Sequence, residues 1–230
     1  MPGFTTGKVT SITRPASTYI DLVFATEVPL VFEPGQFISI RVNERDIRSY
    51  SLAGKVGDSS YGIIVDVKPG GPGSKFFDTL KVNDTFSFLG PLGKFVFNPA
   101  DGAQEILFLA TGSGIAPLKA MLEKAFSLGD TRPMTLYFGL RYTTDIYWDS
   151  YFNALQDAHP NFKFVLCLSQ PDEKWTGVTG HITDLLAVNH PGIAKASCYL
   201  CGNGKMIQEG AELLAKLGMP KERVYFEKFF

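Results

Sequence analysis

Hydrophobic and polar residues mostly alternate along the chain up to about Asn98. A period of two is typical of strands that bury one face of a sheet. The alternating segments are short, with turn residues between them: GKVTSI, YIDLVFA, GQFISIRV, RSYSLAG, YGIIVDV and DTFSFLG. Short strands at this spacing predict an antiparallel β-barrel, in which we expect Greek-key connections.

After Pro99 the pattern changes to uninterrupted hydrophobic runs separated by segments of helical periodicity. These runs are EILFLA, MTLYFG, FKFVLCLS, ASCYLCG and RVYFE. Hydrophobic strands that alternate with helices predict a Rossmann-like parallel sheet. The polar segment FNPADGA lies between the two patterns. We therefore predict a β-barrel domain over residues 1–99 and an α/β domain over residues 100–230.

Composition and charge exclude several classes of function. The chain has 230 residues, 45% of them hydrophobic, which is enough for one large or two small cores. Its formal net charge is -1 and it contains no run of lysines or arginines, so nucleic acid is not an expected partner. No hydrophobic stretch reaches the roughly 18 residues of a membrane span, and the N-terminus lacks the pattern of a signal peptide. We expect a cytoplasmic protein with no membrane partner.

The cysteines and histidines do not predict a metal site. The cysteine count is three, an odd number, and no export signal is apparent, so we expect reduced thiols rather than a disulfide framework. Cys198 and Cys201 form a C-x-x-C pair, but two thiols cannot complete a structural zinc site and no second pair accompanies them. We interpret Cys198 as a small buried hydrophobic residue. The histidines form no motif, and His181 is expected simply to lie near a helix N-terminus.

Two features of the barrel half suggest phosphate binding. Gly70, Gly71 and Gly73 precede Ser74 and a short helical pattern, where bare backbone N–H groups and the helix dipole attract an anion. A plain hairpin loop is the alternative. In the earlier strand RSYSLAG, alternation predicts that Arg48 and Tyr50 lie on one face of the sheet and that Ser51 lies on the other. This pair is suited to holding a phosphate and covering an aromatic ring, although a half-solvated edge strand with a cross-strand pair explains it equally well.

The second half contains a strand, a glycine turn and a helix in the segment EILFLATGSGIAPLKAMLEKAF. This arrangement is typical of the first βα turn of a dinucleotide-binding fold. Its pattern is G-x-G-x-x-P, formed by Gly112, Gly114 and Pro117, and alone it is a weak signal. The two glycines allow the loop to lie close to a pyrophosphate or a nicotinamide. Pro117 suits the first turn of a helix, where its missing N–H is not needed.

Taken together, these motifs resemble the ferredoxin–NADP reductase superfamily. The matching segments are Arg48-Ser49-Tyr50-Ser51, Gly71 to Ser74, Phe88 to Phe95, Gly112 to Pro117 and Cys201-Gly202, in the family's order. The resemblance implies that the barrel holds a flavin, FAD, and that the α/β domain binds NADH or NADPH. It also implies an electron-transferring reductase.

The resemblance assigns roles to individual residues. Arg48 would bind flavin phosphate, Tyr50 would lie against the flavin, and Ser51 would direct its hydroxyl toward flavin N5. Cys201 would contact the nicotinamide, Glu227 would supply a catalytic carboxylate, and Phe229 or Phe230 would cover the flavin. The remaining cofactor-binding residues that it implies are Ser49, Val67, Gly71, Gly73, Ser74, Thr111, Gly112, Gly114, Pro117, Arg141, Ser169 and Gly202.

The function expected from this resemblance is transfer of a hydride from NAD(P)H to FAD and then of single electrons to a protein acceptor. The acceptor would be a ferredoxin, a flavodoxin or an oxygenase component, because this chain lacks the four-cysteine run of an iron–sulfur cluster. Two alternatives remain: a reductase that releases reduced flavin, and a non-catalytic redox-sensing subunit. NADH is the expected coenzyme, since Gln170 follows Ser169 where NADP-specific relatives usually carry an arginine.

Overall fold

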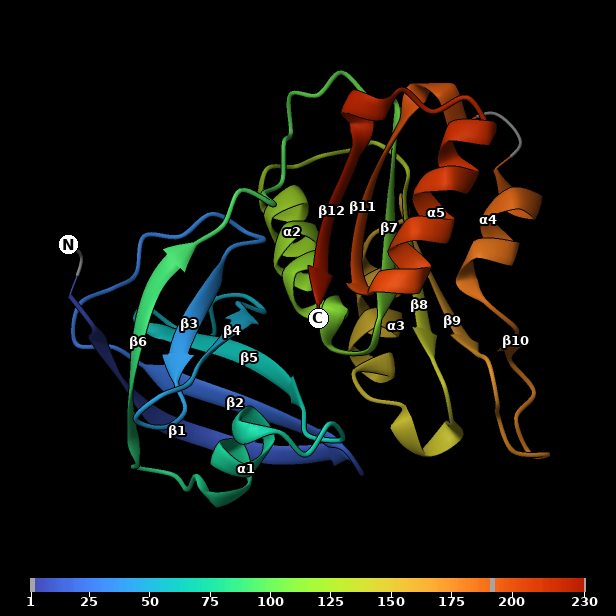
Figure 1. Ribbon diagram of the computed structural model, residues 1–230. Helices are drawn as coiled ribbons and strands as arrows, with labels where there is room; N and C mark the ends of the chain where they lie inside the picture. The colour runs from blue at the N-terminus through green and yellow to red at the C-terminus, as the bar shows by residue number, and fades with distance from the viewer. Residues whose placement is uncertain (1–2, 191–192, 230) are drawn as a thin grey trace. The chain divides into compact units, whose positions relative to one another are not determined.

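The computed structural model describes residues 3–190 and 193–229 (Figure 1). The chain forms two compact units. The first comprises Met1–Phe97 and Ala116–Lys124, and the second comprises Asn98–Ile115 and Ala125–Phe230. A domain boundary after residue 99 remains a prediction, because no single cut of the chain separates these units.

The first unit is built on a six-stranded antiparallel sheet, as predicted. Its strands are β1 (Thr5–Ala16), β2 (Tyr19–Ala25), β3 (Phe37–Arg41), β4 (Ile47–Ser51), β5 (Ser60–Asp66) and β6 (Thr85–Leu92). They lie in the order β4-β3-β6-β1-β2-β5, so β6 separates β3 from β1. The outermost strands, β4 and β5, also contact each other, which curls the sheet toward a barrel. The alternating sequence pattern therefore predicted the strands and their antiparallel class.

The core of the first unit lies inside this curled sheet. Phe24 from β2 packs edge-on against Phe86 and Phe88 from β6, with ring centroids 5.2 and 5.6 Å apart. Helix α1 (Pro72–Thr79) adds Phe77, which is fully buried. Burial of one such side chain contributes about 1.5–3 kcal/mol. Tyr50 of β4 packs edge-on against Phe77, so β4 and α1 share this core.

One later helical segment, Ala116–Lys124, also belongs to the first unit. Lys119 anchors it, because the Lys119 Nζ donates to the Ala53 carbonyl at 3.1 Å and pairs with the Glu123 carboxylate at 2.6 Å. The Lys119 side chain is only 16% exposed. Lys119 thus ties this helical segment to the backbone that follows strand β4.

The second unit contains a parallel sheet, again as predicted, and the sheet has six strands. Its strands are β7 (Glu105–Thr111), β8 (Met134–Leu140), β9 (Phe162–Leu168), β10 (Val178–Thr179), β11 (Ala196–Asn203) and β12 (Val224–Phe229). Their order is β10-β9-β8-β7-β11-β12, and each neighbouring pair is parallel. The two-residue strand β10 was not predicted. The carboxyl ends of these strands share one edge of the sheet, where ligands bind in such folds.

Helices cover both faces of this sheet (Figure 1). The helices of this unit are α3 (Asp149–Ala158), α4 (Ile182–Asn189) and α5 (Gly204–Lys216). Helix α2 (Ile115–Ser127) is divided between the two units. Helices α4 and α5 bury Leu186 and Leu214 in one cluster with Leu109 and Leu200 of the sheet. On the opposite face, Phe152 of α3 stacks on Phe164 of β9 with centroids 5.1 Å apart. Burial on both sides explains the uninterrupted hydrophobic runs.

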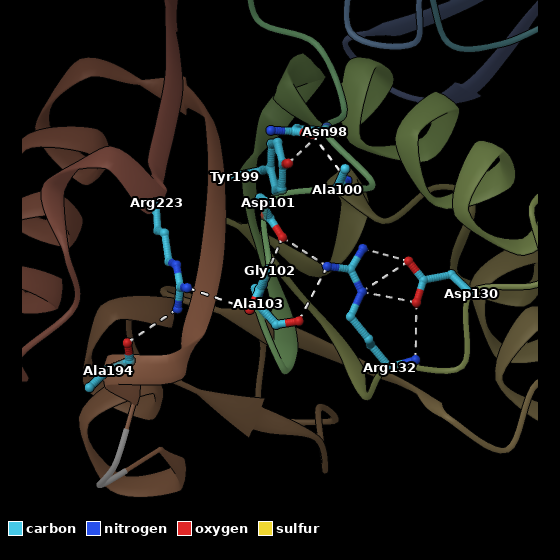
Figure 2. A network of polar contacts seen from close by, with 10 residues as sticks. All are labelled: Asn98, Ala100, Asp101, Gly102, Ala103, Asp130, Arg132, Ala194, Tyr199 and Arg223. Atoms are coloured by element: carbon cyan, nitrogen blue, oxygen red, sulfur yellow. Dashed lines mark hydrogen bonds and ion pairs between the residues drawn. The ribbon is translucent and has the colours of Figure 1, made fainter.

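The polar segment after Phe97 is fixed to the second unit by a network of polar contacts (Figure 2). The Asn98 N–H donates to the Tyr199 hydroxyl at 3.0 Å, and the Asp101 carboxylate accepts from Arg132 at 2.9 Å. Arg132 also binds the Asp130 carboxylate in a bidentate manner, with Nε 3.0 Å from Oδ1 and Nη2 2.6 Å from Oδ2. This contact lowers the pKa of Asp130 below its ordinary value. The segment is therefore an ordered part of the unit.

Within residues 3–190 and 193–229, none of the helices has the length and apolar character needed to cross a membrane.

Candidate functional site

Strand β4 presents the R-x-Y-S residues as predicted. Arg48 pairs with Ile40 and Tyr50 with Ile38 across β3, so both side chains occupy the same face of the sheet. Both lie beside Gly73: a Cβ added there would be 2.3 Å from the Tyr50 hydroxyl and 3.6 Å from Arg48 Cγ. Ser51 is buried, with 4% exposure. The strand therefore brings Arg48 and Tyr50 to the start of α1.

The alternative interpretation, a half-solvated edge strand with a cross-strand pair, also has support in the structure. β4 lies at the end of the sheet order, and the Ser39 and Ser49 hydroxyls form a cross-strand contact at 3.1 Å. An edge strand remains accessible on one side. The two interpretations are compatible, because an edge strand can present side chains to a ligand.

The Arg48 guanidinium is exposed and weakly held. It lies 3.0 Å from the Asp46 carboxylate and donates to the Ile47 carbonyl at 2.9 Å, with 45% of its side chain exposed. The pKa of Asp46 is lowered mainly by the amide of Asn43 and less by Arg48. An exposed ion pair of this kind contributes little to stability. Arg48 can therefore exchange Asp46 for a phosphate at small cost.

The start of α1 offers backbone N–H groups. Gly71 is the N-cap residue and Pro72 the first helical residue, so Gly73 and Ser74 lie within the first turn rather than before the helix. Proline is favoured here because its φ suits the helix and its N–H is not needed. A Cβ added at Gly71 would have no atom within 4 Å, and the first turn carries no acidic residue. Open space, helix N–H groups and a nearby arginine fit a phosphate group.

Two further predicted residues complete this group. The Tyr50 ring packs edge-on against Phe77 at 4.8 Å, and burial raises the pKa of its hydroxyl to about 12. Tyr50 is therefore neutral at physiological pH and presents a partly buried ring. Val67 precedes the glycines; its N–H donates to the Thr18 carbonyl and its own carbonyl accepts from Gly70. Val67 thus fixes the turn that leads into α1.

In the second unit, the glycine turn at the end of β7 packs directly on the end of β11. A Cβ added at Gly114 would lie 2.2 Å from the Cys201 carbonyl oxygen, and one at Gly202 would lie 2.3 Å from Thr111 Oγ1. Gly202 also has a φ of +133°, which side chains rarely adopt. Thr111 Oγ1 accepts from the Asn203 N–H at 2.9 Å. These glycines are required because two backbones meet.

This packing adds a structural reason for one glycine. The sequence assigned both glycines of the turn to close approach by a ligand, and that role remains a prediction. Gly114 also lacks a side chain because Cys201 occupies the space, and Gly112 has a φ of +54° that turns the chain between β7 and α2. Pro117 lies in the first turn of α2, as predicted.

Cys201 and Glu227 occupy paired positions on β11 and β12. Cys201 is fully buried, and burial, with a smaller contribution from Glu227, raises the pKa of its thiol well above the ordinary value. Cys198 is fully buried as well, as predicted, and burial raises its pKa. Both thiols are therefore neutral and are not nucleophiles. All three cysteines of the chain are free and buried.

Arg141 and Ser169 follow the ends of β8 and β9. The Arg141 Nε donates to the Gln170 side-chain carbonyl at 3.1 Å, and the Gln170 N–H donates to the Arg141 carbonyl at 2.8 Å. The Ser169 N–H donates to the Leu140 carbonyl. The Arg141 guanidinium lies over the Tyr142 ring, 5.1 Å from its centroid. The structure thus places a positive charge directly beside Gln170.

The remaining predicted residues are less informative. Phe229 is the last residue of β12, next to Asn203 of β11, and Phe230 lies outside the described residues. His181 precedes helix α4 as its N-cap residue, in agreement with the simple structural expectation. No group of residues in the described part of the chain could hold a metal ion.

Sequence reasoning missed two arrangements. One is the hydroxyl of Tyr147, which donates to the Gly112 carbonyl at 2.9 Å. The other is the Asp101–Arg132–Asp130 network. Neither has a local sequence pattern that joins its members. The only signal for the second is the D-x-R pattern of Asp130 and Arg132 after Gly129, which is typical of a turn.

An antiparallel barrel with a helix start that fits a phosphate, joined in one chain to a parallel sheet with a glycine turn, is typical of flavin- and nicotinamide-binding oxidoreductases. Comparison with family models agrees with this class. The oxidoreductase FAD-binding domain matches residues 7–97, and the oxidoreductase NAD-binding domain matches residues 108–211. The chain belongs to the ferredoxin–NADP reductase superfamily. Its cofactors are FAD and a nicotinamide dinucleotide.

Two proteins similar to this chain are named as electron-transfer or reductase components of oxygenase systems. The toluate 1,2-dioxygenase electron transfer component of Pseudomonas putida is 31% identical over 87% of this chain and 59% of the relative. The ferredoxin–NAD(P)+ reductase component of the naphthalene 1,2-dioxygenase/salicylate 5-hydroxylase systems of a Ralstonia species is 29% identical over 97% of this chain and 68% of the relative. The chain thus spans about three fifths to two thirds of these two proteins' lengths.

A solved structure shows the same fold. The cytochrome P450 reductase GcoB of Amycolatopsis superposes with a TM-score of 0.91 at 29% identity. The match covers 99% of this chain and 70% of that chain. Both units therefore have counterparts in that structure.

Proposed function

We propose that this protein transfers a hydride from NADH or NADPH to bound FAD and then passes electrons singly to a protein acceptor. The observation that carries the proposal is the presence in one chain of an FAD-binding and an NAD-binding domain. When bound, FAD links two-electron to one-electron chemistry. The acceptor would be a ferredoxin, a flavodoxin or an oxygenase component, since similar proteins are named as electron-transfer components of oxygenases.

In the flavin-binding half, the protein's own groups bind and orient. Arg48 and the first-turn N–H groups at Gly73 and Ser74 hold phosphate. Tyr50 presents its neutral ring to the flavin, and Ser51 directs its hydroxyl toward flavin N5. Support comes from the position of Arg48 and Tyr50 on one face beside Gly73. Ser49, Val67 and Gly71 complete the site by shaping the strand and the turn around it.

In the nicotinamide-binding half, the turn Thr111, Gly112 and Gly114 supplies backbone groups, with Pro117 starting the helix behind it. Cys201 and Gly202 face this turn and border the nicotinamide. Glu227 supplies a carboxylate from the neighbouring strand. Arg141 and Ser169 bind the adenosine end of the coenzyme. Support comes from the close packing of this turn on β11 and from the pairing of Cys201 with Glu227. A flavin-covering role for Phe229 or Phe230 remains a prediction of the sequence.

NADH is the proposed coenzyme, because a neutral glutamine follows Ser169 and acidic residues lie shortly after it in the chain. Arg141 works against this preference, since its guanidinium adjoins Gln170 and carries the charge that a 2′-phosphate requires. We expect kcat/KM to be higher for NADH, with measurable activity toward NADPH. Arg141→Ala should lower kcat/KM for NADPH more than for NADH. A wild-type preference for NADPH would contradict this choice of coenzyme.

The test of the proposed function separates it from a flavin-releasing reductase and from a non-catalytic subunit. The purified protein should stay yellow through prolonged dialysis and should reduce ferricyanide with NADH. Loss of the flavin on dialysis, with activity restored by free flavin, would favour the flavin-releasing reductase. A protein that stays yellow but barely reduces ferricyanide would favour the redox-sensing subunit. A cytoplasmic location remains a prediction.

A further inference from the structure

Tyr147 is a buried tyrosine whose hydroxyl has a specific partner in the nicotinamide-binding half. It is 2% exposed and donates to the carbonyl of Gly112 at 2.9 Å. Gly112 is the first glycine of the turn that follows β7, and it lies 35 residues before Tyr147 in the chain. Two distant segments therefore meet at the carboxyl edge of the parallel sheet.

The Tyr147 ring is fixed on two sides. It packs edge-on against Phe138 of β8, with centroids 5.4 Å apart, and Trp148 lies against it at the same centroid distance. Trp148 has a φ of +56°, a left-handed conformation that is costly for a bulky residue. This conformation allows Tyr147 to lie in the core while α3 begins at Asp149, directly after Trp148. The hydroxyl is thus held in place by packing.

The Gly112 carbonyl accepts hydrogen bonds from within the turn and from outside it. Besides the Tyr147 hydroxyl, the Ile115 N–H donates to it within the 3-10 turn Gly112–Gly114. Gly112 has a φ of +54°, and a glycine can rotate its following peptide group more easily than other residues. The Tyr147 hydrogen bond comes from outside the turn, so it opposes rotation of this peptide group in addition to the bond from Ile115.

The orientation of this carbonyl also fixes an N–H group. In a trans peptide the C=O of Gly112 and the N–H of Ser113 point in opposite directions. With the carbonyl held toward Tyr147, the Ser113 N–H points away from Tyr147, out of the turn. A rotated peptide would present a carbonyl oxygen instead, which repels an anion.

We propose that Tyr147 is a positioning residue for dinucleotide binding, which holds the Gly112–Ser113 peptide so that the Ser113 N–H donates to the coenzyme pyrophosphate. The inference rests on the proposed function for the identity of the ligand. It makes Tyr147 necessary for affinity toward the pyrophosphate rather than for the chemical step, because the hydroxyl does not touch the reacting atoms.

The test uses Tyr147→Phe, which keeps the ring and removes only the hydroxyl. Tyr137→Phe is the matched control, since Tyr137 is equally buried on β8 and its hydroxyl contacts His190 and Asn189 instead of the turn. ADP-ribose and adenosine are the probes, measured by calorimetry on the full chain with flavin bound. ADP-ribose carries the pyrophosphate but no nicotinamide, so its binding does not depend on redox activity.

We expect Tyr147→Phe to weaken ADP-ribose binding about three- to tenfold, the loss typical of one hydrogen bond, and to leave adenosine binding unchanged. KM for NADH should rise by a similar factor while kcat is kept. Tyr137→Phe should change neither probe. Equal affinity of Tyr147→Phe and wild type for ADP-ribose would overturn the inference, as would an equal loss for adenosine or for the control.

A second variant tests whether Tyr147 acts through the Ser113 N–H. Ser113→Pro removes the N–H that the proposal credits, at a first-turn position where proline is tolerated. It should weaken ADP-ribose binding, and adding Tyr147→Phe should then cause little further loss. Fully additive losses would overturn the inference. Wild-type protein that binds ADP-ribose but does not oxidise NADH would contradict the proposed function alone, whereas wild-type protein that does not bind ADP-ribose would overturn this inference.

Discussion

Arg48 in the first unit and Arg132 in the second share the same local pattern, an aspartate two residues earlier, but their surroundings differ. Arg48 contacts Asp46 on an edge strand, with 45% of its side chain exposed. Arg132 holds the Asp130 carboxylate through three hydrogen bonds from its side chain, binds Asp101 as well, and is 17% exposed. Asp101 is 3% exposed. The same D-x-R pattern thus gives an exchangeable pair in one unit and a fixed one in the other.

The difference separates binding from structure. An exposed pair is worth little, so its arginine can leave it for a phosphate. A buried network cannot release its arginine without leaving carboxylates unpaired in the interior. The tertiary environment, and not the D-x-R spacing, therefore determines which arginine is available to bind a ligand.

The largest expected effect is on folding. Arg132→Ala should lower the free energy of unfolding by about 3 kcal/mol, because it leaves two largely buried carboxylates without their partner. Arg14→Ala is the control, since Arg14 and Asp78 are 49% and 48% exposed, and it should cost less than about 1 kcal/mol. Urea denaturation measures both. Equal losses for the two variants would mean that burial does not distinguish the pairs.

The next effect concerns the flavin. Arg48→Ala should weaken FAD binding by about one to two decades, the loss expected for one charge-assisted contact to phosphate, while the fold is kept. Arg45→Ala removes a neighbouring exposed arginine and should leave FAD affinity unchanged. Fluorescence titration of the flavin-free protein with FAD gives both affinities. Unaltered FAD binding in Arg48→Ala would show that Arg48 does not bind the phosphate.

A smaller effect concerns the reaction rate. Ser51→Ala and Cys201→Ala should each slow flavin reduction by NADH about tenfold and weaken coenzyme binding less, because both groups align reacting atoms. Cys198→Ala is matched to Cys201→Ala, since it removes an equally buried thiol from the same strand. It should lower stability without changing the reduction rate. Stopped-flow absorbance separates rate from binding, and rates equal to wild type would leave Ser51 and Cys201 purely structural.

The smallest effect is a dependence on pH. Contact with Arg132 lowers the pKa of Asp130 below the ordinary 3.8, so the stability from this contact is present above pH 3.8 and is lost as the pH falls through the lowered value. Arg132→Ala should therefore flatten the decline in unfolding free energy below pH 3.8. Arg48→Ala should flatten it less, because Asn43 is the main cause of the lowered Asp46 pKa. The reverse order would reject the contrast between the two pairs.

Periodicity predicted the strands and both sheet classes, because burial on one or two faces leaves a direct record in the sequence. It missed β10, whose two residues are too few to show a period. It also placed the start of α1 too late, since Gly73 follows Pro72 inside the first turn. Local patterns thus predict the presence of helices and strands better than the residues at which they begin and end.

The candidate site was predictable where its residues are neighbours in sequence. Arg48, Tyr50 and the glycines before α1 fall into this class. The bond from Tyr147 to Gly112 joins residues without a shared motif, and the contact of Gly114 with Cys201 depends on how β7 and β11 pair. Such contacts are set by tertiary packing, so a single sequence carries no signal for them.

The central claim is that this chain binds flavin in one half and uses nicotinamide bound in the other to reduce it. An anaerobic titration of the FAD-loaded protein with NADH, followed by flavin absorbance, tests this claim most directly. The account predicts that about one equivalent of NADH bleaches the flavin fully, as expected for transfer of one hydride to one flavin. Flavin that remains oxidised in the presence of excess NADH and excess NADPH would contradict it.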